Sequence, residues 1–235
     1  MDTQISELNI FRNIPQRKLD ETLDDIKKEF INENGYLDKD GIVLLDAFRG
    51  YFDANIPVDY WFRDMTDFKG DKSIINKYND ITKDIPNSYK TGVNLCLAGK
   101  HGCGKTYACA CILKRVVESR KYSGLYVNLT DVIQHMLSNE NKNEARDLLL
   151  NVDFLIIDEV DQRFMGTENA SSLFGRILEP IMRTRIQNRL PLIFCTNSPN
   201  VVDSFDGQLK ESFKSLMNMV TLLPIMPGKD FRNKK

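Results

Sequence analysis

A glycine-rich run in the middle of the chain has the residue types and spacing of a phosphate-binding loop. The run fits G-x-x-x-x-G-K-[ST] without a mismatch and reads Gly99, Lys100, His101, Gly102, Cys103, Gly104, Lys105, Thr106. Glycines let the backbone curl so that its N–H groups point at phosphate oxygens, and a following helix N-terminus adds partial positive charge. Lys105 would meet the β- and γ-phosphates, and the Thr106 hydroxyl would ligate Mg²⁺. We therefore predict that residues 99–106 bind ATP with Mg²⁺ as cofactor.

Two carboxylates follow an apolar run further along the chain. Residues 154–157 read Phe-Leu-Ile-Ile, and Asp158 and Glu159 come directly after them. Ligands of open α/β sheets bind at the carboxyl ends of the strands, so these acids are expected beside the phosphate loop. We predict that Asp158 holds Mg²⁺ through water and that Glu159 orients and deprotonates an attacking water. The adjacent Glu favours hydrolysis over transfer to a small acceptor.

A third apolar run, residues 192–195, ends in Thr196 and Asn197. Either side chain could hydrogen-bond the lytic water or the γ-phosphate from the strand next to Asp158, and we assign that role to Asn197. The alternative is a plain polar turn, since Asn197 is followed by Ser198 and Pro199.

The elements that would hold these motifs are short apolar runs alternating with helical patterns. The runs are 93–98, 124–127, 154–157, 192–195 and 220–225. Continuous apolar strands separated by helices predict a parallel sheet covered on both faces. We predict an α/β P-loop ATPase core of five parallel strands over residues 91–235. A long helix is predicted over residues 171–189, and it would carry four arginines: Arg176, Arg183, Arg185, Arg189. These arginines could form a DNA-binding face, but a solvated helix face is the simpler interpretation.

The first part of the chain is predicted to be a small helical domain, residues 1–55. Apolar residues recur at three- and four-residue steps through residues 19–30 and 42–52, with charges between them. Residues 56–90 are expected to be an irregular linker, because Pro57, Pro86 and several Asp and Asn residues interrupt them. Its aromatic stretch, residues 60–62, either folds onto the core or lines the base of a nucleotide.

Composition argues against a strongly basic nucleic-acid binder, a membrane-spanning protein and a disulfide-rich protein. The 235 residues carry a net charge of −1, so no global basic field indicates nucleic-acid binding. The apolar runs are too short to cross a bilayer, and the N-terminus does not resemble a signal peptide, so we expect a cytoplasmic protein. None of the five cysteines forms a C-x-x-C pair, and we expect buried thiols acting as small apolar groups.

Residues 55–232 resemble the AAA+ replicative helicase loaders of the DnaC and DnaI type, with the IstB-like ATPases as relatives. Beyond the two ATP motifs, the resemblance rests on Ile56-Pro57 with Phe68, on residues 125–133, on residues 151–159 and on the ending 228–232. It implies an AAA+ core without a helical lid. It also implies a hexameric replicative helicase as partner of residues 1–55, single-stranded DNA as a second partner, and side-by-side assembly of ATPase domains.

One departure from the family concerns the residue that reaches a neighbour's γ-phosphate. The family places an arginine on the helix before the last strand, whereas residues 198–220 contain no arginine. Lys210 and Lys214 are the cations there, and Lys214 is nearest to the expected place. Lysine lacks the guanidinium fork, so we predict slow ATP hydrolysis acting as a switch.

Two other functions fit part of the sequence. An IstB-like ATPase assisting a DNA transposase would share the ATP site and differ only in its partner. A small-molecule kinase would share the phosphate loop, but the Asp158-Glu159 pair argues against it.

Overall fold

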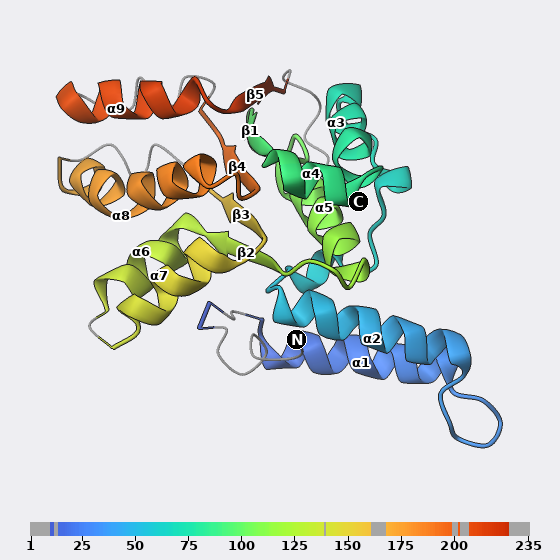
Figure 1. Cartoon of the computed structure of the whole chain (residues 1–235). Coiled ribbons are helices and arrows are strands. Elements are labelled where there is room, and N and C mark those ends of the chain that lie inside the picture. The colour runs from blue at the N-terminus through green and yellow to red at the C-terminus, as the bar shows by residue number, and fades with distance from the viewer. Residues whose placement is uncertain are drawn as a thin grey trace.

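The computed structural model describes residues 10–11, 14–138, 140–160, 168–198, 202 and 207–225. At its centre is a five-stranded sheet in the order β2-β3-β4-β1-β5, with every pairing parallel (Figure 1). The strands are β1 (Asn94–Ala98), β2 (Gly124–Asn128), β3 (Phe154–Asp158), β4 (Leu192–Thr196) and β5 (Thr221–Pro224). The predicted five-stranded parallel α/β core is therefore confirmed.

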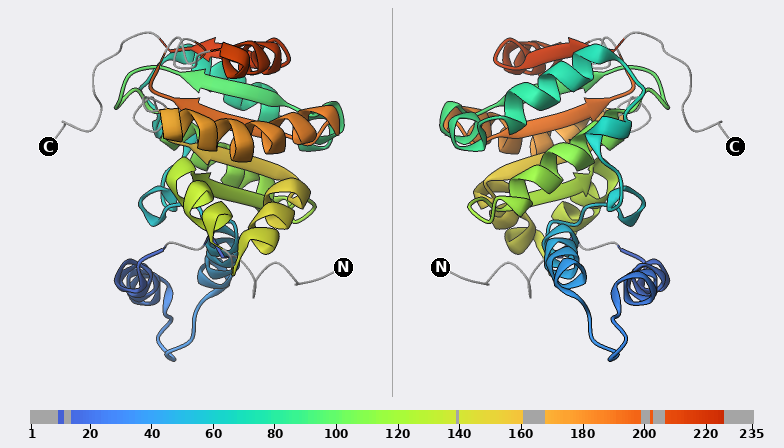
Figure 2. Two further views of the ribbon diagram at one scale, coloured as in Figure 1. Left: turned by 90° about the vertical axis from the view of Figure 1, so that its left-hand side faces the viewer. Right: turned by 90° about the vertical axis from the view of Figure 1, so that its right-hand side faces the viewer.

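Helices cover both faces of the sheet, because the central strands are apolar on both sides (Figure 2). One face packs against α5 (Lys105–Glu118), and the other against α6 (Leu129–Leu137), α7 (Lys142–Asn151), α8 (Glu168–Gln187) and α9 (Gly207–Met217). Side chains alternate along each strand, so Tyr126, Ile156 and Cys195 lie on the α5 face, while Val127 and Phe194 lie on the other.

The N-terminal region contains a helical hairpin made of α1 (Gln16–Phe30) and α2 (Lys39–Asp53). Asp38 caps α2 by accepting a hydrogen bond from the Gly41 N–H at 2.8 Å. Ile26, Phe48 and Tyr51 of the hairpin belong to the same apolar cluster as α5. The two predicted helices are confirmed, and the domain boundary at residue 55 stays a prediction.

The linker, residues 56–90, differs from the prediction because it contains two α-helices. After two short 3₁₀ turns, Val58–Tyr60 and Met65–Asp67, come α3 (Lys72–Thr82) and α4 (Ile85–Thr91). Asp71 and Asp84 begin these helices by accepting from the N–H groups of Ser73 and Asn87. Pro86 is in the first turn of α4, where a missing N–H costs nothing. Asp71, Asp84 and Pro86, which predict an irregular linker, therefore mark the starts of two helices.

The arginines of the predicted long helix do not form one solvated face. Arg185 has 0% exposure and donates to the carbonyls of Leu149, Asp153 and Pro191 at 2.8–3.0 Å. Burial lowers the pKa of its guanidinium to about 10. Arg189 lies beyond α8, in a turn with φ +55°. Arg185 thus joins α7 to the starts of β3 and β4.

No helix among the described residues is long and apolar enough to cross a membrane. The ending 228–232, which contributed to the family resemblance, and Pro199 lie outside the described residues.

Candidate nucleotide-binding site

The phosphate loop connects β1 to α5 at the carboxyl edge of the sheet. Gly102 and Gly104 have φ of +76° and +93°, which side-chain-bearing residues rarely adopt. Gly104 is the N-cap of α5 and supplies no side-chain acceptor, and the first turn of α5 carries no acidic residue. The first N–H groups of the helix therefore have no side-chain cap, which suits an anion-binding helix end.

Lys105 is folded into the loop. It is only 6% exposed, and its Nζ donates to the carbonyls of Gly99 at 2.7 Å and Lys100 at 3.0 Å. A third bond goes to Asn197 Oδ1 at 2.8 Å. The ammonium group thus connects the phosphate loop to the end of β4, and the motifs at residues 99–106 and 192–197 meet as predicted.

The second cluster is centred on the buried carboxylate of Asp158 at the end of β3. Its Oδ2 accepts from Thr106 Oγ1 and from the Tyr126 hydroxyl, each at 2.6 Å. Its Oδ1 accepts from the backbone N–H of Glu159 at 2.7 Å. Burial, and secondly the charge of Asp158, raises the pKa of Tyr126 well above its ordinary value, so this phenol is a firm donor. The predicted Mg²⁺ ligands Thr106 and Asp158 are therefore in direct contact.

Glu159 and Thr196 differ in how they face the site. Glu159 is exposed and has φ +56°, a conformation uncommon for a residue with a side chain. It turns the chain so that the next residue, Val160, donates to the carbonyl of Cys195. Thr196 is fully buried, and its hydroxyl accepts from the Ser198 N–H at 3.1 Å. Of the two polar residues that end β4, Asn197 is the one that contacts Lys105.

The linker packs along α5 and reaches the phosphate loop. Lys114 Nζ donates to the carbonyls of Trp61 at 2.7 Å and Arg63 at 2.6 Å, and Tyr107 donates to the Asp64 carbonyl at 2.6 Å. The Phe68 ring then lies against Gly104, where an added Cβ would be only 2.4 Å from the ring. The linker therefore folds onto the core, as one of the two alternatives expected, and Phe68 forms a wall of the loop.

The five cysteines are free and buried, as predicted. Cys109 and Cys195 have sulfurs 3.2 Å apart beneath the site, and Cys103 Sγ is 3.7 Å from Lys105 Nζ. Burial raises the pKa of Cys195, so its thiol behaves as an apolar group.

The donor set fits a magnesium ion bound together with phosphates. Among the described residues, no group of three or more His, Cys, Asp or Glu side chains could hold a metal by itself. One hydroxyl and one carboxylate, from Thr106 and Asp158, match the way Mg²⁺ uses few protein ligands and completes its shell with waters and nucleotide oxygens.

Lys214 lies on α9, the helix before β5, and is exposed. The neighbouring residues Phe213 and Leu216 pack into the apolar cluster on the face of the sheet opposite α5. Arg183 of α8 also reaches α9, where it donates to the Ser212 carbonyl at 2.8 Å.

Two contacts of the site could not be anticipated. Tyr126 is part of an apolar strand run, and nothing in its local sequence marks it as a partner of Asp158. Phe68 was noted as a family-like residue, but its contact with Gly104 depends on tertiary packing.

Comparisons with known proteins identify the family of this chain. The ATPase family associated with various cellular activities (AAA) matches residues 95–218. The replicative helicase loader DnaI of Bacillus subtilis (strain 168) is 25% identical over 201 residues, which are 84% of this chain and 55% of DnaI. The chain thus spans just over half the length of that relative.

Two solved structures share the fold. A crystal structure of DnaI has a TM-score of 0.59 and 20% identity, over 74% of this chain and 93% of that one. A crystal structure of the DnaC helicase loader has a TM-score of 0.55 and 19% identity, over 71% and 98%. The resemblance to the DnaC/DnaI type is confirmed. Because the family model matches more than half of the residues, the chain belongs to the ATPase family associated with various cellular activities (AAA).

Proposed function

We propose that this protein is an ATP-dependent loader of a hexameric replicative helicase onto single-stranded DNA, in which slow ATP hydrolysis acts as a switch. The observation that carries the ATPase part is the meeting of Lys105, Thr106, Asp158 and Asn197 at one sheet edge. The loader part is supported by the similarity to DnaI, whose name describes that activity.

Each residue of the site has a role in ATP binding and hydrolysis. The N–H groups of residues 99–106 surround the phosphates, and Lys105 exchanges its carbonyl partners for β- and γ-phosphate oxygens. Thr106 directly and Asp158 through water would hold Mg²⁺, which would neutralise phosphate charge. Glu159 is the general base for the lytic water, and its exposed position next to Asp158 leaves it accessible to that water.

Asn197 links hydrolysis to the state of the loop. Its Oδ1 accepts from Lys105 at 2.8 Å when no phosphate competes. When Lys105 turns to a γ-phosphate, its bond to Asn197 Oδ1 is lost, and Asn197 can then orient the lytic water. Loss of the γ-phosphate returns Lys105 to Asn197, and this exchange is the proposed switch.

Lys214 is the proposed cation in trans. It is exposed on α9, and in a homo-oligomer it would approach the γ-phosphate of a neighbouring copy. A lysine there supplies point charge without bidentate hydrogen bonding, which supports slow turnover.

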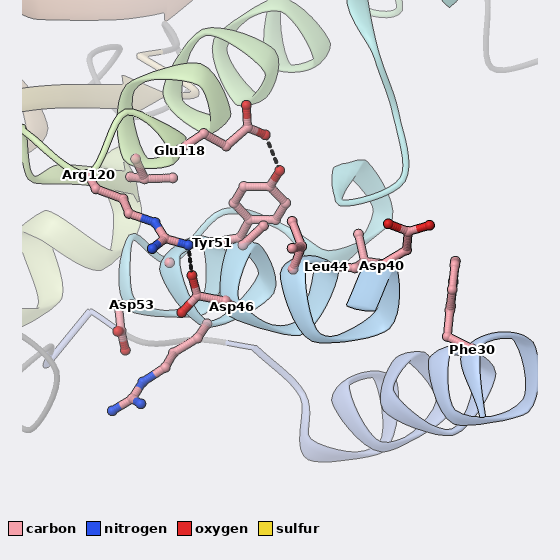
Figure 3. Close-up of a pocket in the computed structure, with 13 residues that line it drawn as sticks. Phe30, Asp40, Leu44, Asp46, Tyr51, Asp53, Glu118 and Arg120 are labelled. Atoms are coloured by element: carbon pink, nitrogen blue, oxygen red, sulfur yellow. Dashed lines mark hydrogen bonds and ion pairs between the residues drawn. The ribbon is translucent and has the colours of Figure 1, made fainter. Parts of the chain in front are cut away.

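The helical hairpin is the proposed helicase-binding part, within residues 1–55. Four large apolar side chains are exposed on it: Ile31, Tyr36, Ile42, Val43. Beside them, α2 and the end of α5 line a pocket of ≈ 770 Å³ with Leu44 and Val117 in its wall (Figure 3). Such clustered apolar exposure on a soluble protein favours a protein partner.

The rim of this pocket favours a basic partner surface. Four carboxylates line it, from Asp40, Asp46, Asp53 and Glu118, against the two guanidinium groups of Arg49 and Arg120. Asp46 of α2 pairs with Arg120, which follows α5, at the edge of this pocket (Figure 3). We assign the pocket to an apolar segment of the helicase flanked by basic residues.

A pull-down from native extract tests the loader function. The full chain is immobilised with and without ATP and single-stranded DNA, beside three variants. Lys105→Ala removes the phosphate ligand. Val43→Glu places a charge in the pocket wall, and Leu137→Glu is the matched control, because Leu137 is equally exposed, 55% against 59%, on α6.

The loader function requires a hexameric helicase retained by the wild type and by Leu137→Glu and lost with Val43→Glu. Lys105→Ala should alter the ATP dependence of capture. Recovery of a transposase would replace the loader function with the IstB-like alternative. Phosphate transfer to a small acceptor without DNA would replace both with a kinase.

A further inference from the structure

Tyr126 contacts the proposed magnesium site from a strand that carries none of the predicted motif residues. Its hydroxyl donates to Asp158 Oδ2 at 2.6 Å, and the side chain is only 4% exposed. The same oxygen accepts from Thr106 Oγ1 at 2.6 Å. Two hydroxyl groups, one from β2 and one from α5, thus converge on one carboxylate oxygen.

The sheet register explains this contact. Asn128 of β2 is paired with Asp158 of β3, and Tyr126 precedes Asn128 by two residues. Positions two apart point to the same face of a strand, so Tyr126 and Asp158 both face α5. The long phenol side chain then reaches diagonally along the strands to the carboxylate.

We propose that Tyr126 is a positioning residue that orients Asp158 for Mg²⁺, an inference that rests on the proposed ATPase function. Tyr126 and Thr106 hold Oδ2, and the Glu159 N–H holds Oδ1 at 2.7 Å. Because donors from β2, from α5 and from the residue after β3 hold both oxygens, rotation of the carboxylate is restricted.

The same hydrogen bonds also orient the Thr106 hydroxyl for binding a cation. Its hydroxyl proton is committed to Asp158, so the oxygen lone pairs remain free for a cation. Without the Tyr126 hydroxyl, only Thr106 and the Glu159 N–H would hold the carboxylate, so its orientation relative to Thr106 would be less restricted. Groups that orient a metal ligand typically contribute 10–100-fold to metal affinity.

The chain provides a closely matched control. Tyr51 is also 4% exposed, and its hydroxyl also donates to a carboxylate, that of Glu118 at the far end of α5. Tyr51→Phe and Tyr126→Phe therefore delete the same atom from the same kind of hydrogen bond. Only Tyr126→Phe removes it from the Asp158 carboxylate.

The test measures binding of a fluorescent ATP analogue, first in EDTA and then across a Mg²⁺ titration. All titrations are run at a temperature where circular dichroism shows each protein folded. Tyr126→Phe should require about tenfold more Mg²⁺ for half-maximal enhancement, with affinity in EDTA unchanged. Tyr51→Phe should match the wild type in both.

Three results would contradict this expectation in distinguishable ways. An unchanged Mg²⁺ requirement in Tyr126→Phe overturns the positioning role. Equal weakening in EDTA and in Mg²⁺ assigns Tyr126 to the general structure of the site and also overturns it. Failure of the wild type to bind the analogue under any condition overturns the proposed ATPase function itself.

Discussion

Gly104→Ala tests how closely the linker packs over the phosphate loop. Gly104 has φ +93°, and an added Cβ would be 2.4 Å from Cε2 and 2.7 Å from Cζ of Phe68. The ring has little room to retreat, because a Cβ at Gly70 would be 2.3 Å from Cζ and the Tyr107 ring packs at 5.4 Å between centroids. The alanine methyl must therefore displace the ring or the loop.

The expected cost has two separable parts. Left-handed backbone strain contributes roughly 1–2 kcal/mol, and overpacking against the ring contributes about 1–3 kcal/mol. Gly104→Ala should thus lower the free energy of unfolding by about 2–5 kcal/mol. Gly35→Ala isolates the first part, because Gly35 has φ +80° and no atom within 4 Å of the added Cβ.

A double-mutant cycle isolates the second part. Phe68→Leu removes Cε2 and Cζ, the atoms nearest to the new methyl group. In Gly104→Ala/Phe68→Leu the overpacking should largely disappear, giving a coupling energy of about 1–3 kcal/mol. Urea unfolding without nucleotide, followed by far-UV circular dichroism, measures all four proteins. Additivity within about 0.5 kcal/mol would refute the contact between Phe68 and the loop.

Three further predictions concern stability, pH and turnover. Arg185→Met leaves three buried carbonyls without their donor and should lower the free energy of unfolding by about 3–5 kcal/mol in urea, whereas exposed Arg176→Met should change it by less than about 0.5 kcal/mol. Burial raises the pKa of the Cys111 thiol to about 12, so its stabilising contribution is complete below the unfolded-state pKa and is lost as pH rises from about 9 to 12. Cys111→Ser should flatten that decline by up to ~1.4 kcal/mol per pH unit in denaturation measured across this range. Lys214→Arg should raise phosphate release by about tenfold or more at assembling concentrations, and equal rates would remove Lys214 from the site.

The sheet and the phosphate loop could be predicted because their information is local. A run such as residues 154–157 is apolar throughout, so it indicates a strand buried on both faces. The loop requires glycines at positions with positive φ, and both Gly102 and Gly104 have positive φ. Since parallel strands end at a common edge, Asp158 and Asn197 could be expected on the same side of the sheet as the loop. Their adjacency depends on the strand order, which the structure supplies.

The linker helices were missed because their start signals have two meanings. Asp71 and Asp84 are common both in turns and as helix N-caps, and Pro86 is common both in breaks and in first helical turns. The sequence predicts a solvated position for Arg185 because charged side chains are usually exposed. That expectation fails where backbone acceptors converge on the side chain. Carbonyls from α7 and from the residues just before β3 and β4 converge here, which only the folded chain reveals.

The contact of Tyr126 with Asp158 could not be predicted from the sequence at all. When a strand is buried on both faces, its apolar pattern carries no alternation, so the sequence does not indicate which side chains face α5. Only the pairing of Asn128 with Asp158 puts Tyr126 on the same face as the carboxylate. A motif therefore identifies the groups that touch ATP and Mg²⁺, whereas the groups that hold them in place depend on register. In this chain the proposed positioning residue lies on β2, where its hydroxyl reaches the carboxylate at the end of β3.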